Sequence, residues 1–494
     1  MRRRSVRNKT FALVVFTLFS LLLLGGIWYQ NPGWGLMDDL ANIKVAGSFW
    51  LDPHHAWAQN VASELNRGRF RPGYFLWIIL AYRIAHPLFI YMLMAALNIS
   101  ILLVWGRSIG LLFEKKDPQR DFLHYIYPWT FFLFAPFWNN FMYISLQEKF
   151  LFIFGGISLY FFIRSYQKDS LKDLGWAGLF LTFSLFSKET SAAFLVVYIL
   201  YALFDLIIFK ENKKISVCHL AVYTVYLGGY YIFVKHLLKG YTGKYNEAAH
   251  SSQIFLHLVN APGIIRLLLL LGITAVGGYV GIFFFKRTKN PRPEYILFPL
   301  FLTVYIILLA PWGYMTYLLA PLAPFVMVLF LPGVYFLNRC GQRAFYGSIG
   351  LTVMLSLVAV LYIGMPKIER IANIQKTVTH IKGINTGERE SRFFYPWPYI
   401  ETGVTLPRFT QADVIYLKDG HLTEKMLGEG DNYLVYDIQA SATSLRDITI
   451  GPLVYQNSTW KIYRLKRSVG KKEEFKPAFD LNAVQKLKNF IKRI

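Results

Sequence analysis

A series of long apolar runs constrains this chain more than any other feature. The runs are roughly 18 to 25 residues long, the length that an α-helix needs to cross the hydrocarbon core of a bilayer. The chain is 54% hydrophobic and only 17% charged, whereas ordinary soluble domains have about 25% charged residues. The sequence therefore predicts an α-helical polytopic membrane protein, with runs at 11–29, 88–113, 122–140, 148–164, 174–209 (two, divided at Ser187-Lys188-Glu189), 215–235, 263–285, 294–310, 313–337 and 343–364.

Basic residues between the runs predict the orientation, because Lys and Arg concentrate in cytoplasmic loops. The first run follows a basic N-terminus and has no small-residue cleavage site after it, so we expect an uncleaved span that starts in the cytoplasm. The stretch 72–85, about 14 residues, is too short to cross, and we expect it to lie along the outer face. About eleven spans then place the C-terminus outside. The same path puts every basic group on the cytoplasmic side: Lys115, Lys116, Arg120; Arg164, Lys168, Lys172; Lys210, Lys213, Lys214; Lys286, Arg287, Lys289, Arg292; Arg339, Arg343.

Hydrophobicity falls to ordinary levels from about Met365. The remaining ~130 residues suit one small domain. β-rich runs at 414–416, 433–436, 453–455 and 460–464 are separated by turn residues, which predicts an α+β fold. We therefore expect a transmembrane domain at 1–364, including a first outer loop at 30–87, and a small extracytoplasmic C-terminal domain at 365–494. The end of the chain, 481–494, is predicted to form a basic amphipathic helix on lipid headgroups.

Charge and cysteine content exclude several classes of function. The net charge of +24 is explained by cytoplasmic loops and by attraction to anionic membrane lipids, so no nucleic-acid partner is expected. The two cysteines, Cys218 and Cys340, lie at or within apolar segments. They are interpreted as small buried hydrophobic residues, and not as a disulfide or a metal site.

The first outer loop contains the strongest candidate site. It opens with the adjacent carboxylates Asp38 and Asp39 and closes with the basic run that holds Arg69 and Arg71. A loop that only fixes topology needs Lys and Arg alone, whereas this loop combines acids, bases and aromatic residues. The pair His54-His55 follows Asp52-Pro53 and is interpreted as loop material, since adjacent histidines do not share a helix face.

A second group of polar residues is expected on the same side of the membrane. Charged groups at the ends of spans line a cavity or pair with one another. We take Glu148, Lys188 and Glu189 as cavity candidates; alternatively, Glu148 pairs with Lys149 and Lys188 with Glu189. Trp312 and Tyr314 lie at the mouth of a span, where they could stack on a sugar or belong to an interfacial aromatic belt.

An enzyme on this side has no access to nucleotide-activated donors and must use a donor delivered in the membrane. A lipid-linked phosphate fits, because arginines such as Arg69 and Arg71 bind phosphate bidentately. Asp38 or Asp39 could act as general base on an acceptor hydroxyl or amine, or could help to hold a divalent cation beside the leaving phosphate. The chemistry implied is glycosyl transfer with departure of the phosphate.

Three motifs carry a resemblance to a known group: Trp34-Gly-Leu-Met-Asp38-Asp39, Arg71-Pro72-Gly-Tyr74 and Ser145-Leu-Gln-Glu148. They resemble the GT-C superfamily of polyprenyl-phosphate-dependent glycosyltransferases, which includes protein mannosyltransferases and aminoarabinose transferases of lipid A. The resemblance implies a polyprenyl-phosphate-linked sugar donor and an envelope glycan, lipid or protein acceptor. It also implies that Asp38 or Asp39 is the catalytic base and that Arg69 or Arg71 contacts the donor phosphate. The chain has no WWD motif, which argues against N-glycosylation of protein sequons. It has no DxD triplet but only the adjacent aspartates, so the metal requirement stays open.

Two alternatives remain at the level of the sequence. An O-antigen ligase or polymerase would rely on the late loop 236–262, with His250 and His257 as working groups. A lipid-linked-sugar transporter or flippase would show charges at mid-membrane depth and repeat symmetry between its halves. The preferred interpretation is a glycosyltransferase of the bacterial inner or plasma membrane that acts on its outer face.

Overall fold

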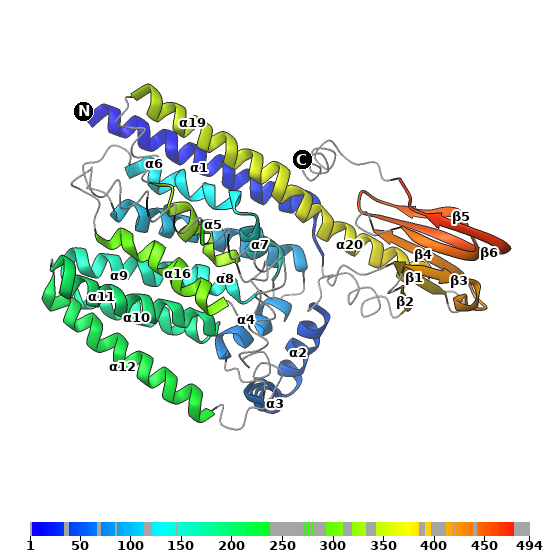
Figure 1. The fold of residues 1–494 in the computed structure, drawn as a ribbon, viewed down its shortest axis with the longest axis horizontal. Helices are drawn as coiled ribbons and strands as arrows, with labels where there is room; N and C mark the ends of the chain where they lie inside the picture. The colour runs from blue at the N-terminus through cyan, green and yellow to red at the C-terminus, as the bar shows by residue number, and fades with distance from the viewer. Residues whose placement is uncertain are drawn as a thin grey trace. The chain divides into compact units, whose positions relative to one another are not determined.

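The structure is a computed structural model, drawn in Figure 1. The chain divides into two compact units. The first comprises residues 1–25, 45–83 and 92–363, and the second comprises residues 26–44, 84–91 and 364–494. The structure describes residues 2–33, 39–66, 71–83, 86–112, 120–144, 146–210, 212–237, 268, 271–272, 275, 279, 293–309, 319–331, 342–384, 391–396, 412–417, 420–437 and 442–478.

The first unit is built from helices, as the apolar runs predict. Within the described ranges, six helices are long and apolar enough to cross a membrane: Lys9–Gln30, Pro87–Leu111, Glu148–Lys168, Ala192–Phe209, Lys213–Ile232 and Tyr346–Ile384. The α-helical membrane fold class is thereby confirmed. The number of about eleven spans stays a prediction, since most of 263–285 and part of 313–337 lie outside the described residues.

The helical elements begin and end as follows. The regular helices are α1 (Arg2–Gln30), α2 (Asp39–Leu51), α3 (Pro53–Asn66), α4 (Pro72–Arg83), α5 (Pro87–Leu111), α6 (Arg120–Tyr125), α7 (Asn139–Met142), α8 (Glu148–Phe150), α9 (Gly156–Lys168), α10 (Leu171–Leu185), α11 (Ala192–Phe204), α12 (Lys213–Leu237), α16 (Leu297–Leu309), α17 (Ala323–Val328), α19 (Gln342–Val358) and α20 (Met365–Ile384). The 3-10 and π-helical segments are η1 (Tyr127–Leu133), η2 (Ala135–Trp138), η3 (Leu151–Gly155), η4 (Glu189–Ser191), η5 (Asp205–Phe209), η6 (Pro293–Ile296), η8 (Ala320–Leu322) and η9 (Ala359–Gly364).

The run 122–140 differs from the prediction of a single span. It is broken into α6, η1, η2 and α7, and prolines stand at the first turns of η1 and η2. Proline has no backbone N–H and cannot continue a regular helix. Instead, a packed aromatic cluster holds the segment together, with Phe132 and Trp138 fully buried at a centroid distance of 4.7 Å. The single-helix prediction for this run was wrong.

The division of the run 174–209 is confirmed, because α10 ends at Leu185 and α11 begins at Ala192. A tight turn joins α9 to α10. Asp169 ends α9 in the left-handed region (φ 50°), and Ser170 caps α10 by accepting a hydrogen bond from Asp173 N at 3.2 Å. Side-chain caps of this kind satisfy the free N–H groups at a helix start.

The second unit contains a six-stranded sheet with the order β2-β1-β4-β6-β5-β3. Strand pairs β2–β1, β1–β4 and β3–β5 are parallel, whereas β4–β6 and β5–β6 are antiparallel. The predicted runs fall on β2, β4, β5 and β6, so the strand-containing C-terminal region is confirmed. The helix α20 and the strand β1 were not predicted, and 481–494 lies outside the described residues. The strands are β1 (Arg392–Pro396), β2 (Asp413–Leu417), β3 (His421–Thr423), β4 (Asn432–Asp437), β5 (Thr443–Gln456) and β6 (Trp460–Phe475).

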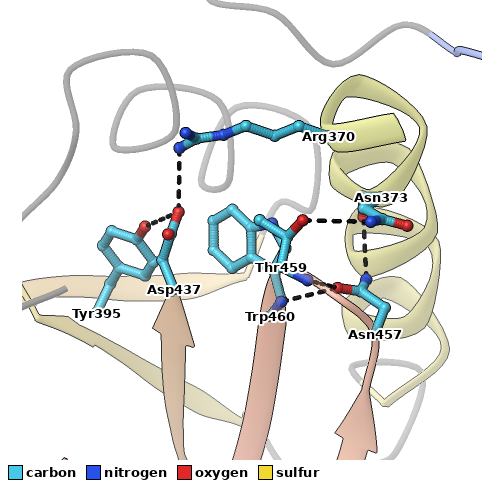
Figure 2. Close-up of polar contacts among 7 residues, drawn as sticks. All are labelled: Arg370, Asn373, Tyr395, Asp437, Asn457, Thr459 and Trp460. Carbon is cyan, nitrogen blue, oxygen red and sulfur yellow. Dashed lines mark hydrogen bonds and ion pairs between the residues drawn. The ribbon is translucent and has the colours of Figure 1, made fainter. Parts of the chain in front are cut away.

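Polar contacts tie α20 to this sheet (Figure 2). Arg370 Nη2 lies 3.3 Å from Asp437 Oδ2 on β4, and Tyr395 OH on β1 donates to the same oxygen at 3.3 Å. Asn373, one turn further along α20, donates to Thr459 Oγ1 at 3.2 Å. A carboxylate that is 2% exposed needs such partners, because burying an unpaired charge is costly.

The turn between β5 and β6 is organised by Asn457. Its Oδ1 accepts hydrogen bonds from Thr459 N at 2.9 Å and from Trp460 N at 2.7 Å, as Figure 2 shows for Trp460. Its Nδ2 donates to Thr377 Oγ1 on α20 at 3.1 Å and to Tyr455 OH at 2.9 Å. Both ends of this amide are therefore engaged in folding the hairpin.

Candidate active site

Three segments of the first unit meet around the start of α4. Gly73 N donates to Phe186 O, beyond the end of α10, at 3.2 Å. Trp77 Nε1, one turn into α4, donates to Ile144 O at 2.9 Å. A Cβ at Gly73 would lie 2.8 Å from Ser187 Oγ. Glycine therefore allows α4 to approach the turn after α10 at a distance that a larger residue would not.

Arg71 begins this junction. Pro72 at the first position of α4 pre-sets the helical φ and needs no N–H partner. Arg71 is 3% exposed, and its guanidinium donates a hydrogen bond to Gln147 Oε1 and lies 5.3 Å from the centre of the Tyr74 ring. The candidate residues of the first outer loop are Asp38, Asp39, Arg69 and Arg71. The structure describes the side chain of Arg71 alone among these four.

Glu148 and Lys188 form an ion pair between two segments. Lys188 Nζ lies 2.8 Å from Glu148 Oε1, with side chains 8% and 3% exposed. The contact is electrostatic, since Oε1 accepts no well-aligned hydrogen bond from any described residue. Such a pair at low dielectric is held strongly only if the surroundings add hydrogen bonds. The sequence placed both residues at a cavity, and the structure brings them together.

Lys149 is fully buried beside this pair. Its Nζ donates to Tyr143 O and to Ile144 O, each at 2.6 Å, and lies 5.7 Å from the Trp77 ring centre. The sequence analysis named Lys149 only as the alternative ion-pair partner of Glu148, which pairs with Lys188 in the structure. The signal was available, because three consecutive polar residues at the start of an apolar span are costly unless they have partners.

Cations outnumber carboxylates among the described side chains of this junction: Arg71, Lys149 and Lys188 against Glu148. A concentration of buried cations favours an anionic group, and an arginine beside a lysine suits phosphate in particular. The described side chains of the junction therefore have the charge that would attract a phosphate group. Glu189 begins η4 next to Lys188, but its side chain lies outside the described residues.

Several other predicted residues also lie outside the described regions of the chain: Asp38, Arg69, Trp312, Tyr314, His250 and His257. Asp39 begins α2, without a description of its side chain. His54 and His55 lie in the first turn of α3, where Asp52 Oδ1 accepts from His55 N at 3.0 Å. The loop prediction for these histidines was wrong, because Asp followed by Pro is a helix start signal.

No group of three or more His, Cys, Asp or Glu residues that could hold a metal ion occurs within the described ranges. Asp38 and the side chain of Asp39 lie outside those ranges.

A family model supplies the comparison with known proteins. Residues 127–230 match the family described as dolichyl-phosphate-mannose-protein mannosyltransferase. The resemblance to the GT-C glycosyltransferases is confirmed. The matched segment contains Gln147, Glu148, Lys149 and Lys188, which belong to two of the three stretches that meet at the junction. The match covers about a fifth of the chain.

Two solved structures are distantly similar to the chain. One is the oligosaccharyltransferase of Archaeoglobus fulgidus in its apo form, at 11% identity and a TM-score of 0.45, covering 87% of this chain and 70% of that one. The other is ArnT from Cupriavidus metallidurans bound to undecaprenyl phosphate, at 10% identity and a TM-score of 0.42, covering 92% and 97%. TM-scores below 0.5 mark only a remote likeness. No curated protein matches the chain by sequence.

Proposed function

We propose that this chain moves a sugar from a polyprenyl-phosphate donor to a cell-envelope acceptor, on the extracytoplasmic side of a bacterial inner membrane. The observation that carries the proposal is the junction at which Arg71, Lys149 and Lys188 lie buried with Glu148. A buried cationic site at the end of apolar helices suits a lipid whose headgroup is a phosphate: Arg71 and Lys188 bind the headgroup, and the helices pack against the lipid tail.

Each residue has a role in this proposal. Arg71 and Arg69 bind the donor phosphate, and Lys188 exchanges Glu148 for a phosphate oxygen when the donor enters. Asp38 or Asp39 takes the proton of the acceptor hydroxyl or amine. The new bond forms at the anomeric carbon while the bond from that carbon to the phosphate oxygen breaks, and polyprenyl phosphate leaves. A divalent cation held by the aspartates would stabilise the charge on the leaving phosphate. Glu148 and Glu189 orient the sugar, and Trp312 and Tyr314 stack on it.

The proposal includes a topology. The N-terminus starts in the cytoplasm, α4 lies along the outer face without crossing, and residues 365–494 form a separate outer domain after the transmembrane domain at 1–364. Helix α4 has 12 residues, about 18 Å at 1.5 Å per residue, which is shorter than the hydrocarbon core of about 30 Å.

The test is transfer of labelled sugar in membranes that contain the protein. The double variant Asp38→Ala/Asp39→Ala should abolish transfer while protein levels stay the same. Arg71→Ala should weaken use of the donor, and polyprenyl phosphate alone should inhibit the wild type. The matched control is His54→Ala/His55→Ala, which changes two exposed residues of α3 and should leave transfer unchanged. Normal activity in the aspartate double variant would reject the site.

A further inference from the structure

Lys149 contributes a buried positive charge that no step of the proposed reaction uses. Its side chain is 0% exposed, and its ammonium is bound by main-chain carbonyl groups at 2.6 Å, from Tyr143 and from Ile144. The ring of Trp77 flanks it at 5.7 Å. Charge-assisted bonds of this length are among the strong hydrogen bonds of proteins.

The two carbonyl groups belong to the turn that follows α7. Tyr143 N donates to Asn139 O at 3.1 Å to close the last turn of α7, and Leu146 N donates to Tyr143 O at 3.2 Å. Ile144 O also accepts from Trp77 Nε1 at 2.9 Å. Main-chain carbonyl oxygens carry a partial negative charge and attract cations. The ammonium of Lys149 therefore holds this turn in one conformation and fastens it to α4.

The turn leads directly into the residues that hold the cations of the junction. Gln147 accepts a hydrogen bond from Arg71, and Glu148 pairs with Lys188. These two residues precede Lys149 immediately, so the position of each follows from the conformation of the turn. An apolar side chain of the same length could fill the space beside Trp77 without the cost of burying a charge. The charge is therefore needed for its bonds to the turn.

We propose that Lys149 is the positioning residue of this site: by binding the carbonyl groups of Tyr143 and Ile144 it sets Gln147 and Glu148, and through them Arg71 and Lys188, for the donor phosphate. The inference rests on the proposed function for the identity of the ligand. It makes no use of Lys149 as a contact to substrate.

A double-mutant cycle tests the inference, with equilibrium binding of a short-chain polyprenyl phosphate to the full-length protein in lipid nanodiscs. Lys149→Met should weaken binding by about tenfold or more, and Lys149→Arg, which keeps donor groups near the two carbonyls, should stay within about threefold of the wild type. In an Arg71→Ala/Lys188→Ala background, Lys149→Met should cause little further loss, because a residue that acts only through others is not additive with them. The matched control is Lys168→Met, an exposed lysine at the end of α9.

A purely structural role would give a different pattern. Losses that multiply in the cycle, or an equal loss in Lys149→Arg and Lys149→Met, would overturn the inference. Hydrogen exchange in the ligand-free protein provides a second test that needs no substrate. Exchange of the amides of Tyr143 and Leu146 should be faster in Lys149→Met and unchanged in Lys168→Met. If the wild type does not bind polyprenyl phosphate, the proposed function fails. Hydrogen exchange then still decides about Lys149, and unchanged exchange at these amides rejects its role.

Discussion

Lys188 Nζ lies 2.8 Å from Glu148 Oε1, and this pair joins the start of α8 to the turn between α10 and η4. Two spans that are separate in sequence are thereby linked by opposite charges at the same level of the first unit. Loss of the pair should affect both stability and donor binding, and the two effects can be separated.

Removing one member of the pair should cost more than removing both. Lys188→Met leaves the carboxylate of Glu148 buried without this cation, which typically costs about 3–5 kcal/mol. Lys188→Met/Glu148→Gln should recover a large part of that loss, because no unpaired charge remains. Thermal unfolding of the purified protein in detergent measures both.

The reversed pair Glu148→Lys/Lys188→Glu separates stability from function. It should recover stability, because the attraction is kept, but it should not recover donor binding if Lys188 contacts the phosphate. Equal stability of the Lys188→Met variant and the wild type would show that the pair contributes nothing.

Gly73 should tolerate no side chain without a compensating change. Gly73→Ala places a Cβ 2.8 Å from Ser187 Oγ, whose hydroxyl also donates to Phe183 O at 2.8 Å. Overpacking of this kind costs about 1–3 kcal/mol. The second variant, Gly73→Ala/Ser187→Ala, removes the clashing hydroxyl and should recover most of the stability. Unfolding midpoints of the two variants check this, with Gly47→Ala, which has open space around its Cβ, as the control.

The tie between α20 and the sheet predicts a stability change confined to the second unit. Arg370→Met removes a partner of Asp437, which is 2% exposed and keeps its contact with Tyr395. We expect a loss of about 1–3 kcal/mol, the cost of an under-satisfied buried polar group. Hydrogen exchange in β4 and α20 should rise while exchange in α9 and α10 stays constant. A uniform rise in all helices would contradict the assignment of this contact to one unit.

Tyr416 on β2 predicts a dependence on alkaline pH. Burial raises the pKa of its phenol well above the usual value, and no described residue bonds its hydroxyl oxygen. Above about pH 10 the unfolded chain loses this proton while the folded chain keeps it, so the free energy of unfolding falls as the pH rises. Tyr416→Phe should be neutral or slightly stabilising at pH 8 and should reduce the fall between pH 10 and 11. Unfolding curves across that range, with Tyr29→Phe as an exposed control, measure the difference.

The sequence predicted the elements that depend on local periodicity. The length of the apolar runs predicted α5, α9 and α12. The β-rich runs between turn residues predicted β2 and β4. The run 122–140 was mispredicted because hydropathy does not register proline, and Pro128 and Pro136 start new turns within it. Helix α20 was missed because its polar residues Arg370 and Asn373 face partners on the sheet, and such partners do not show in hydrophobic spacing.

The site residues stay a prediction, and the contact between two of them could not be predicted from the sequence. Charged residues at span ends marked Glu148 and Lys188, since hydrocarbon makes unpaired charges costly. Which carboxylate faces which ammonium depends on how distant spans pack, and the described pair crosses between them. The clamp formed by Lys149 was equally hidden, because its partners are main-chain carbonyl groups, which carry no sequence signature.

The amide of Asn457 has a consequence for how the protein behaves in other hosts. Asn457-Ser458-Thr459 reads as an acceptor for N-linked carbohydrate, yet both ends of this side chain hold the hairpin turn and its contact with α20. An oligosaccharide attached at Nδ2 would have to displace Thr377 and Tyr455. When the protein is produced through a eukaryotic secretory route, Asn457 should stay unglycosylated in the folded second unit. A glycan at this position would identify chains that were modified before the hairpin formed.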